Sequence, residues 1–173
     1  ENRRYASNHS QQCLFDVVEN GDRDPAVRPN QILAVSLAHS MVDSDRARKI
    51  VEKVESDLLT PVGLRSLSPH DEHYCRVYYG SPFERDSAYH QGTVWGWLIG
   101  PFVDAYRKVN GANEATEKRV TEILSGFAAH LSEAGIGQIS EIFDAEPPFN
   151  PRGCFAQAWS VAEVLRVLGS RPA

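Results

Sequence analysis

The chain has 173 residues, of which 42% are apolar and 24% charged, a composition typical of one folded domain rather than of a disordered tail. Its formal net charge is −5 and its lysines and arginines are not clustered, so it offers little to a phosphate backbone or an anionic membrane. We therefore expect neither nucleic acid nor a membrane among its partners.

Two helices are predicted in the first third of the chain. Residues 29–42 are apolar on most sides and Pro29 suits a first helical turn, so this helix is expected to be buried. The next helix begins at Asp43 or Ser44, whose side chains can accept hydrogen bonds from its first free amides. It is expected to be amphipathic and to lie outside, because its apolar residues recur every three to four positions: Ala47, Ile50, Val51, Val54 and Leu58.

The pairing of a buried helix with an amphipathic one repeats further along the chain. Residues 92–109 predict a second buried helix, whose apolar part is too short and too interrupted to cross a bilayer. Residues 113–133 predict its amphipathic partner, with Asn113 as N-cap. A third buried helix is expected over about residues 155–168, and the sequence has no long alternating strand. These elements predict an all-α fold.

Two connections, residues 60–91 and 134–153, are longer than the ~12–15 residues of ordinary structureless links. Long loops often carry function, and each of these leads into a predicted buried helix. Their residues are therefore expected to converge on one end of the bundle. The inner and outer pairs suggest a toroid of helical hairpins, although the same periodicity fits any helical bundle.

The cysteines indicate a reducing compartment. Cys13, Cys75 and Cys154 are odd in number, far apart and without a CxxC pair, which disfavours a disulfide framework or a zinc ribbon. We expect a cytoplasmic location. The chain starts with Glu1 rather than methionine and shows no secretion signal before Cys13, so it is expected to begin inside a longer protein.

The segment 139–159 combines the groups that a sugar-cleaving site needs. Its loop holds Glu141 and Asp144 among prolines, and the helix that follows begins near Gln157 and Trp159. Carboxyl groups act in glycosidases as acid, base or nucleophile, and aromatic faces support a pyranose ring. Glu141 lies between apolar residues and is expected to be paired or catalytic. Asp144 either binds sugar or orders the loop, and an acidic surface loop remains the alternative for the whole segment.

Further candidate sugar contacts each have a structural alternative. His90 and Gln91 precede a predicted helix and either cap it or contact substrate. Trp95 and Trp159 are candidate sugar platforms on helices where a core role is the usual one, and Trp97 is expected in the core. Polar side chains that could bind hydroxyls, orient a carboxylate or form a structural ion pair are Arg28, Asn30, Gln31 and Arg65.

No cofactor is predicted, and the sequence favours no metal site. Two histidines and two acids fall together at residues 70–73, but they lack the helical spacing of a hydrolytic zinc motif, and a solvated turn explains them equally well. Arg152 is expected to hold the Asp144 loop in place. Gly92, Gly96 and Gly100 recur every four residues and are expected to let neighbouring helices approach closely.

Several motifs in consistent order resemble the C-terminal part of glycogen debranching enzymes, the amylo-α-1,6-glucosidase domain. The resemblance runs from about Leu14 to the end of the chain. Its motifs are Arg28-Pro-Asn-Gln31, Thr60-Pro-Val-Gly-Leu-Arg-Ser-Leu67, Tyr89-His-Gln-Gly-Thr-Val-Trp95, Ser140-Glu-Ile-Phe-Asp144 and Gln157-Ala-Trp159.

The resemblance implies a fold and a reaction. The fold would be a glucoamylase-like (α/α)6 toroid, with residues 1–173 as the C-terminal part, roughly half, of a single glycosidase domain. The reaction would be hydrolysis of α-1,6-linked glucose at a trimmed branch of glycogen or another branched α-glucan, with inversion. Family correspondence makes Glu141 the general base and assigns His90 and Gln91 to sugar hydroxyls.

The family's proton donor is an Asp in an upstream Trp-Met-Asp element, which this chain lacks because its one methionine, Met41, is followed by Val42. The resemblance therefore implies that the chain alone is inactive, since an inverting mechanism needs both carboxyl groups. The missing N-terminal half, or a self-associated copy, is the expected protein partner. The alternatives are another (α/α)6 α-glucosidase, such as a glucoamylase or trehalase relative, and a non-catalytic helical carbohydrate-binding module.

Overall fold

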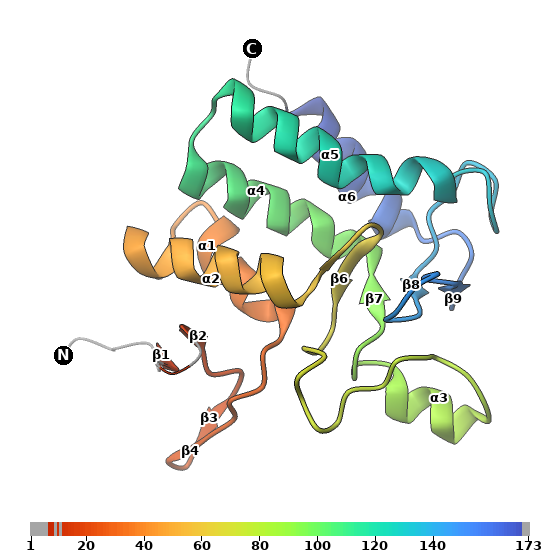
Figure 1. The fold of residues 1–173 in the computed structure, drawn as a ribbon, viewed down its shortest axis with the longest axis horizontal. Coiled ribbons are helices and arrows are strands. Elements are labelled where there is room, and N and C mark those ends of the chain that lie inside the picture. Colours follow the sequence, from red (N-terminus) through yellow and green to blue (C-terminus); the bar gives the residue numbers. More distant parts are fainter. Residues whose placement is uncertain (1–6, 9, 11, 171–173) are drawn as a thin grey trace.

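The structure of the chain is a computed structural model that describes residues 7–8, 10 and 12–170. The two ends of the predicted domain 1–173 thus lie outside the described residues. The helices are η1 (Pro29–Ile32), α1 (Leu33–Ser36), α2 (Ser44–Asp57), α3 (Pro82–Ala88), η2 (Gly96–Leu98), α4 (Ile99–Asn110), α5 (Glu114–His130) and α6 (Ala158–Gly169). Helices α1, α2, α4, α5 and α6 lie together, short strands join several of them at one end, and α3 lies apart beyond the strands (Figure 1).

The amphipathic helices α2 and α5 begin where the sequence predicts. The side chain of Asp43 accepts from the amide of Arg46 at 2.9 Å, and that of Asn113 accepts from the amide of Thr116 at 3.0 Å. Each cap satisfies one of the amides that a helix leaves free in its first turn. Both predicted N-caps are confirmed.

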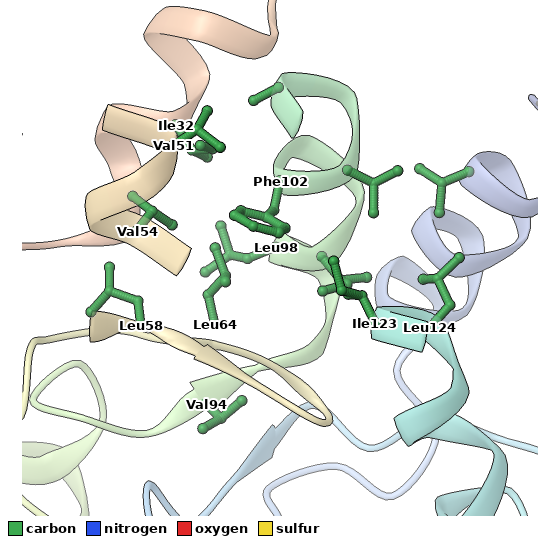
Figure 2. Packing of buried hydrophobic residues seen from close by; sticks show 14 of the residues in the cluster. Ile32, Val51, Val54, Leu58, Leu64, Val94, Leu98, Phe102, Ile123 and Leu124 are labelled. Carbon is green, nitrogen blue, oxygen red and sulfur yellow. The ribbon is translucent and has the colours of Figure 1, made fainter. Parts of the chain in front are cut away.

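Helix α4 is the centre of the hydrophobic core. It contacts α1, α2, α5 and α6, and Phe102 on it is fully buried. Figure 2 shows Phe102 and Leu98 beside Val51 and Val54 of α2, with the β6 residue Leu64 below them. Removing an aromatic side chain from such a position typically costs about 3–5 kcal/mol, so this contact largely fixes α2 against α4.

A five-stranded antiparallel sheet lies at one end of these helices. Its order is β5-β6-β7-β8-β9, and its registers pair Leu64 with Trp95 and Val94 with Phe143. Strand β5 follows α2, β7 leads into η2 and α4, β8 follows α5, and β9 precedes α6. The two long connections therefore meet at one end of the helices, as predicted, but they do so in a sheet that was not predicted. The strands are β5 (Leu59–Thr60), β6 (Gly63–Arg65), β7 (Val94–Trp95), β8 (Ile142–Phe143) and β9 (Pro151–Arg152).

The prediction of an all-α fold, as half of an (α/α)6 toroid, is wrong. The five-stranded sheet overturns it, and two further strand pairs lie near the N-terminus. The strands contain only two or three residues, too few to show an alternating pattern in the sequence. The N-terminal pairs are β1 (Ser7–Asn8) with β2 (Cys13–Leu14), and β3 (Val18–Glu19) with β4 (Asp22–Arg23).

Two predicted buried helices are shorter than expected. The helix predicted over 92–109 starts as strand β7, because Val94 and Trp95 pair with strands on both sides, and α4 begins only at Ile99. The helix predicted over 29–42 ends at Ser36, and Leu37 is extended. The ammonium group of Lys108 contacts the carbonyl oxygens of Val35 and Leu37 at 3.0 and 2.7 Å and satisfies these groups at the helix end.

The glycines at 96 and 100 allow α6 to approach the start of α4. A Cβ at Gly96 would lie 3.2 Å from Ser160 Oγ, and one at Gly100 would collide with the Glu163 side chain. These two positions confirm the predicted close packing. Gly92 differs, because it lies ahead of β7 with φ +133°, where a Cβ would collide with the Cys75 carbonyl. None of the helices in the described part of the chain has the length and apolar character needed to span a bilayer.

Candidate active site

Glu141 immediately precedes β8 and has its carboxylate held on both oxygens. The hydroxyl of Tyr89 donates to Oε1 at 2.6 Å, and the backbone amide of Cys154 donates to Oε2 at 3.0 Å. The Glu141 amide in turn donates to the Cys154 carbonyl at 2.8 Å. The side chain is half-buried rather than free in solvent. Each oxygen accepts one of these bonds and keeps a further lone pair for a water molecule or a ligand.

The residue before Glu141 is anchored to the end of α5. The buried ring of His130 accepts the Ser140 amide on Nε2 at 3.1 Å, and its Nδ1 lies 3.2 Å from a Glu133 carboxylate oxygen. Since Nε2 accepts, the hydrogen of the neutral ring is on Nδ1 and is donated to Glu133. The ring also meets Phe143 edge-on at 4.7 Å. His130 thereby fixes the backbone on which Glu141 stands.

Tyr89 joins Glu141 to a cluster of aromatic rings. Its ring meets Trp95 edge-on with centroids 5.0 Å apart, and His90 stacks on the same Trp95 at 5.0 Å and 6°. Burial and the bond to Glu141 raise the pKa of Tyr89, so its hydroxyl stays protonated and can donate at neutral pH. Burial and the nearby Arg28 lower the pKa of His90, which favours the neutral ring.

A pocket of about 310 Å³ opens beside these rings. Trp97 and Trp159 stack within its lining at 4.1 Å, and Trp159 remains 54% exposed. Ring faces with a few polar groups at the edges suit a ligand that has one apolar face and many hydroxyls. The lining residues are Arg28, Pro29, Asn30, Ser66, His90, Trp95, Trp97, Leu98 and Trp159.

Arg28 organises one wall of the pocket. Its guanidinium donates to the carbonyl oxygens of Ser66 and His90 at 3.1 and 2.6 Å and to Gln91 Oε1 at 2.9 Å. It also pairs with Asp16 at 3.3 Å. Because these bonds span segments far apart in the chain, Arg28 orients His90 and Gln91, and it also lines the pocket itself.

Arg65 and Asp144 have structural partners. Arg65 donates to the Ala145 carbonyl at 2.9 Å and tethers the acidic loop to β6. Asp144 is buried, and Arg152 donates to its two oxygens at 3.1 and 2.9 Å. Burial raises the pKa of Asp144, but the Arg152 bonds and the Tyr78 amide outweigh it and hold the pKa below its usual value. Arg152 thus holds this loop as expected, while sugar binding by Arg65 and Asp144 stays a prediction.

Gln31 and Gln157 use their amides locally. The side chain of Gln31 accepts from the Leu14 amide at 3.3 Å and donates to the Arg28 carbonyl at 3.0 Å. Gln157 is the N-cap of α6 and accepts from the Trp159 amide at 3.4 Å. Neither residue lines the pocket, and their sugar contacts also stay predictions.

Tyr89 and Trp97 are the candidate site residues that sequence reasoning missed. Tyr89 opens the segment 89–95, which carries three aromatic side chains in seven positions, so its neighbours were a signal for it. Trp97 was expected in the core; it is half-buried against the core and also stacks on Trp159 within the pocket lining. In the portion of the chain covered by the structure, no group of three His, Cys, Asp or Glu side chains is arranged to hold a metal ion.

Comparison with known proteins gives two related findings. A protein-family model described as Amylo-alpha-1,6-glucosidase matches residues 2–166. The chain is also 34% identical, over 162 residues, to the glycogen debranching enzyme of Saccharomyces cerevisiae. That alignment covers 82% of this chain and 10% of the yeast enzyme, so the chain spans about a tenth of the length of this relative.

Proposed function

This chain belongs to the amylo-alpha-1,6-glucosidase family, and on that premise we propose that it carries the general base and part of the sugar pocket of a glycosidase. The substrate we propose is the α-1,6-linked glucose at a branch point of glycogen or another branched α-glucan. The observation that carries the proposal is the contact chain from the Glu141 carboxylate through Tyr89 to Trp95 at the aromatic pocket.

In the proposed reaction, the Glu141 carboxylate takes a proton from a water molecule as the water oxygen attacks the anomeric carbon. A carboxylic acid on the opposite face of the sugar protonates the leaving oxygen, and the configuration is inverted. Inverting pairs stand roughly 6.5–9.5 Å apart so that the water fits between them. The free lone pairs of the Glu141 carboxylate make it suitable for this role.

Binding of the glucosyl unit would use the pocket walls. The ring faces of Trp95, Trp97 and Trp159 would support the apolar face of a pyranose, while Arg28, Asn30 and His90 at the edges would contact hydroxyls. Gln91, held by Arg28, would add a further amide. A mostly apolar pocket with a few placed polar groups is the usual composition of a site for a small ligand.

We propose that residues 1–173 act as the C-terminal part of a glycosidase domain whose proton donor lies in another segment of the enzyme. That segment, or a second copy of the chain, is the proposed protein partner. The 173-residue chain alone is then expected to release no measurable glucose from a branched dextrin, because it holds the base without the acid.

The test is the release of glucose from a branched limit dextrin by the intact polypeptide that carries this chain. Glu141→Gln should lower kcat by about 10²–10⁴-fold, the usual contribution of a general base. Glu146→Gln is the matched control, because Glu146 lies in the same loop and also accepts a bond from a tyrosine, Tyr74, at 2.6 Å. Full activity of Glu141→Gln would contradict the proposal.

A second candidate function is glucan binding without cleavage. It is favoured by the fact that Glu141 is not among the residues that line the pocket. Limit dextrin bound by the intact polypeptide but never hydrolysed would support it.

Comparing limit dextrin with maltose and trehalose as substrates would separate a debranching activity from that of another α-glucosidase.

A further inference from the structure

We propose that Tyr89 is a positioning residue for Glu141 and that its hydroxyl orients and stabilises the carboxylate that acts as general base. The inference rests on the proposed function of Glu141 and goes beyond it, because it assigns a role to a second residue. Tyr89 acts through Glu141 and needs no contact with the sugar.

The geometry of the contact is that of a strong hydrogen bond to a charged acceptor. The Tyr89 oxygen lies 2.6 Å from Glu141 Oε1, within the ~2.5–2.7 Å typical of a hydroxyl donating to a carboxylate. The Cys154 amide fixes the other oxygen at 3.0 Å. With one donor on each oxygen, the carboxylate can neither rotate freely nor turn its lone pairs away from a bound water molecule.

Tyr89 is itself held in place. Its ring meets Trp95 edge-on at 5.0 Å and tilts against Tyr78 at 5.8 Å. Its carbonyl oxygen accepts a hydrogen bond from the Thr93 hydroxyl, and Arg28 donates to the carbonyl oxygen of the next residue, His90. The hydroxyl is thus pointed at Glu141 by contacts on both sides of the residue, which is what a positioning group requires.

Gly153 leaves the space that the Glu141 carboxylate occupies. Its backbone is left-handed, with φ +64°, and a Cβ there would collide with Glu141 Oε2. A side chain at 153 would therefore push the carboxylate away from both Tyr89 and the Cys154 amide. Glycine suits this position because the backbone is left-handed and because an added Cβ would displace the Glu141 carboxylate.

The decisive variant is Tyr89→Phe, which keeps the ring and removes only the hydroxyl. In the intact polypeptide we expect kcat on limit dextrin to fall roughly 10–100-fold, the range for loss of a hydrogen bond to a charged group, with KM within about two-fold. Tyr74→Phe removes an equally short tyrosine–glutamate bond elsewhere and should leave kcat nearly unchanged.

A double-mutant cycle shows whether Tyr89 acts through Glu141. On a Glu141→Gln background, Tyr89→Phe should have little further effect on kcat. An equal loss on both backgrounds would overturn the inference and leave the proposed function standing. Full activity of Glu141→Gln would instead remove the proposed function itself.

A variant at Gly153 tests the position of the Glu141 carboxylate independently. Gly153→Ala should lower kcat by displacing the carboxylate. Gly137→Ala is its control, because Gly137 is also left-handed, with φ +79°, but has nothing within 4 Å of an added Cβ. Both variants carry the cost of a left-handed alanine, roughly 1–2 kcal/mol, so the contacts of the added Cβ with Glu141 and Ile142 separate them. Equal kcat values in the two variants would contradict the claim that Gly153 keeps the Glu141 carboxylate in position.

Discussion

Glu141 and Asp144 lie three residues apart on either side of strand β8, yet their surroundings suit them to different tasks. Asp144 is buried and accepts four hydrogen bonds, two from Arg152 and one each from Asn150 and the Tyr78 amide. Glu141 accepts two and keeps lone pairs free. A carboxylate whose lone pairs are all hydrogen-bonded stabilises the fold, whereas an oriented carboxylate with free lone pairs can accept a proton.

The ion pair of Asp144 should make stability depend on pH. The pKa of Asp144 in the folded chain lies below its usual value, so the pair contributes above about pH 4 and the contribution is lost as pH falls through the folded value. We expect Asp144→Asn to cost about 3 kcal/mol at pH 7, and the difference from wild type to shrink towards pH 3. Urea unfolding at both pH values checks this, and a cost that does not change with pH would contradict it.

At the scale of single residues, the sequence could single out Glu141 as a candidate, because burying an unpaired carboxylate between Ile139 and Ile142 is costly. Its partner could not, because Tyr89 lies 52 positions away and reaches Glu141 only when β7 pairs with β8. Sugar contacts were predicted for Gln31 and Arg65, but the sequence could not show that both side chains already donate hydrogen bonds to backbone carbonyl oxygens.

Among the secondary-structure elements, periodicity and caps identified α2 and α5 well. Both are long enough to show several turns of apolar spacing, and each has an Asp or Asn at its N-cap. The strands could not be recognised, because a pair of residues such as Val94–Trp95 reads equally well as the start of a buried helix. The conformation of these residues depends on pairing between distant segments, and the local hydrophobic periodicity of the sequence does not show that pairing.

One contact between elements is open to a direct test. Gly126 on α5 faces the β5–β6 hairpin, and a Cβ there would lie 2.7 and 2.8 Å from the backbone C and Cα of Pro61. Backbone cannot swing aside as a flexible side chain can, so we expect Gly126→Ala to destabilise the fold by about 1–3 kcal/mol in urea unfolding. Gly169→Ala on α6 is the control, since an added Cβ meets nothing within 4 Å, and it should be neutral or slightly stabilising. Equal stability of the two variants would argue against this contact.

At the scale of the whole molecule, α6 leaves an apolar face uncovered. Trp159 and Leu165 are 54% and 63% exposed, and Leu168 is exposed on the following turn. Leu165 and Leu168 are three residues apart and share one side of the helix, whereas Trp159 lies on another side; exposed apolar side chains of this kind favour association.

We expect the 173-residue chain to self-associate with rising concentration, and sedimentation velocity over a hundred-fold concentration range checks this. Leu165→Gln should weaken the association because it removes the most exposed large apolar side chain of α6, while leaving the buried Val164 and Val167 in place. Glu122→Gln on the exposed side of α5 serves as a control for a general surface change. A monomer at every concentration would contradict the expectation.

The pairing of β6, β7 and β8 also bears on when the site comes into existence during folding. These strands lie about 30 and 50 residues apart along the chain, whereas each helix closes its own hydrogen bonds locally. Contacts that close long loops form late and are the slow part of assembly. Individual helices can therefore form while Glu141 and Tyr89 are still apart, and amide hydrogen exchange should find the ladder around residues 94 and 143 opening more readily than the interior of α4.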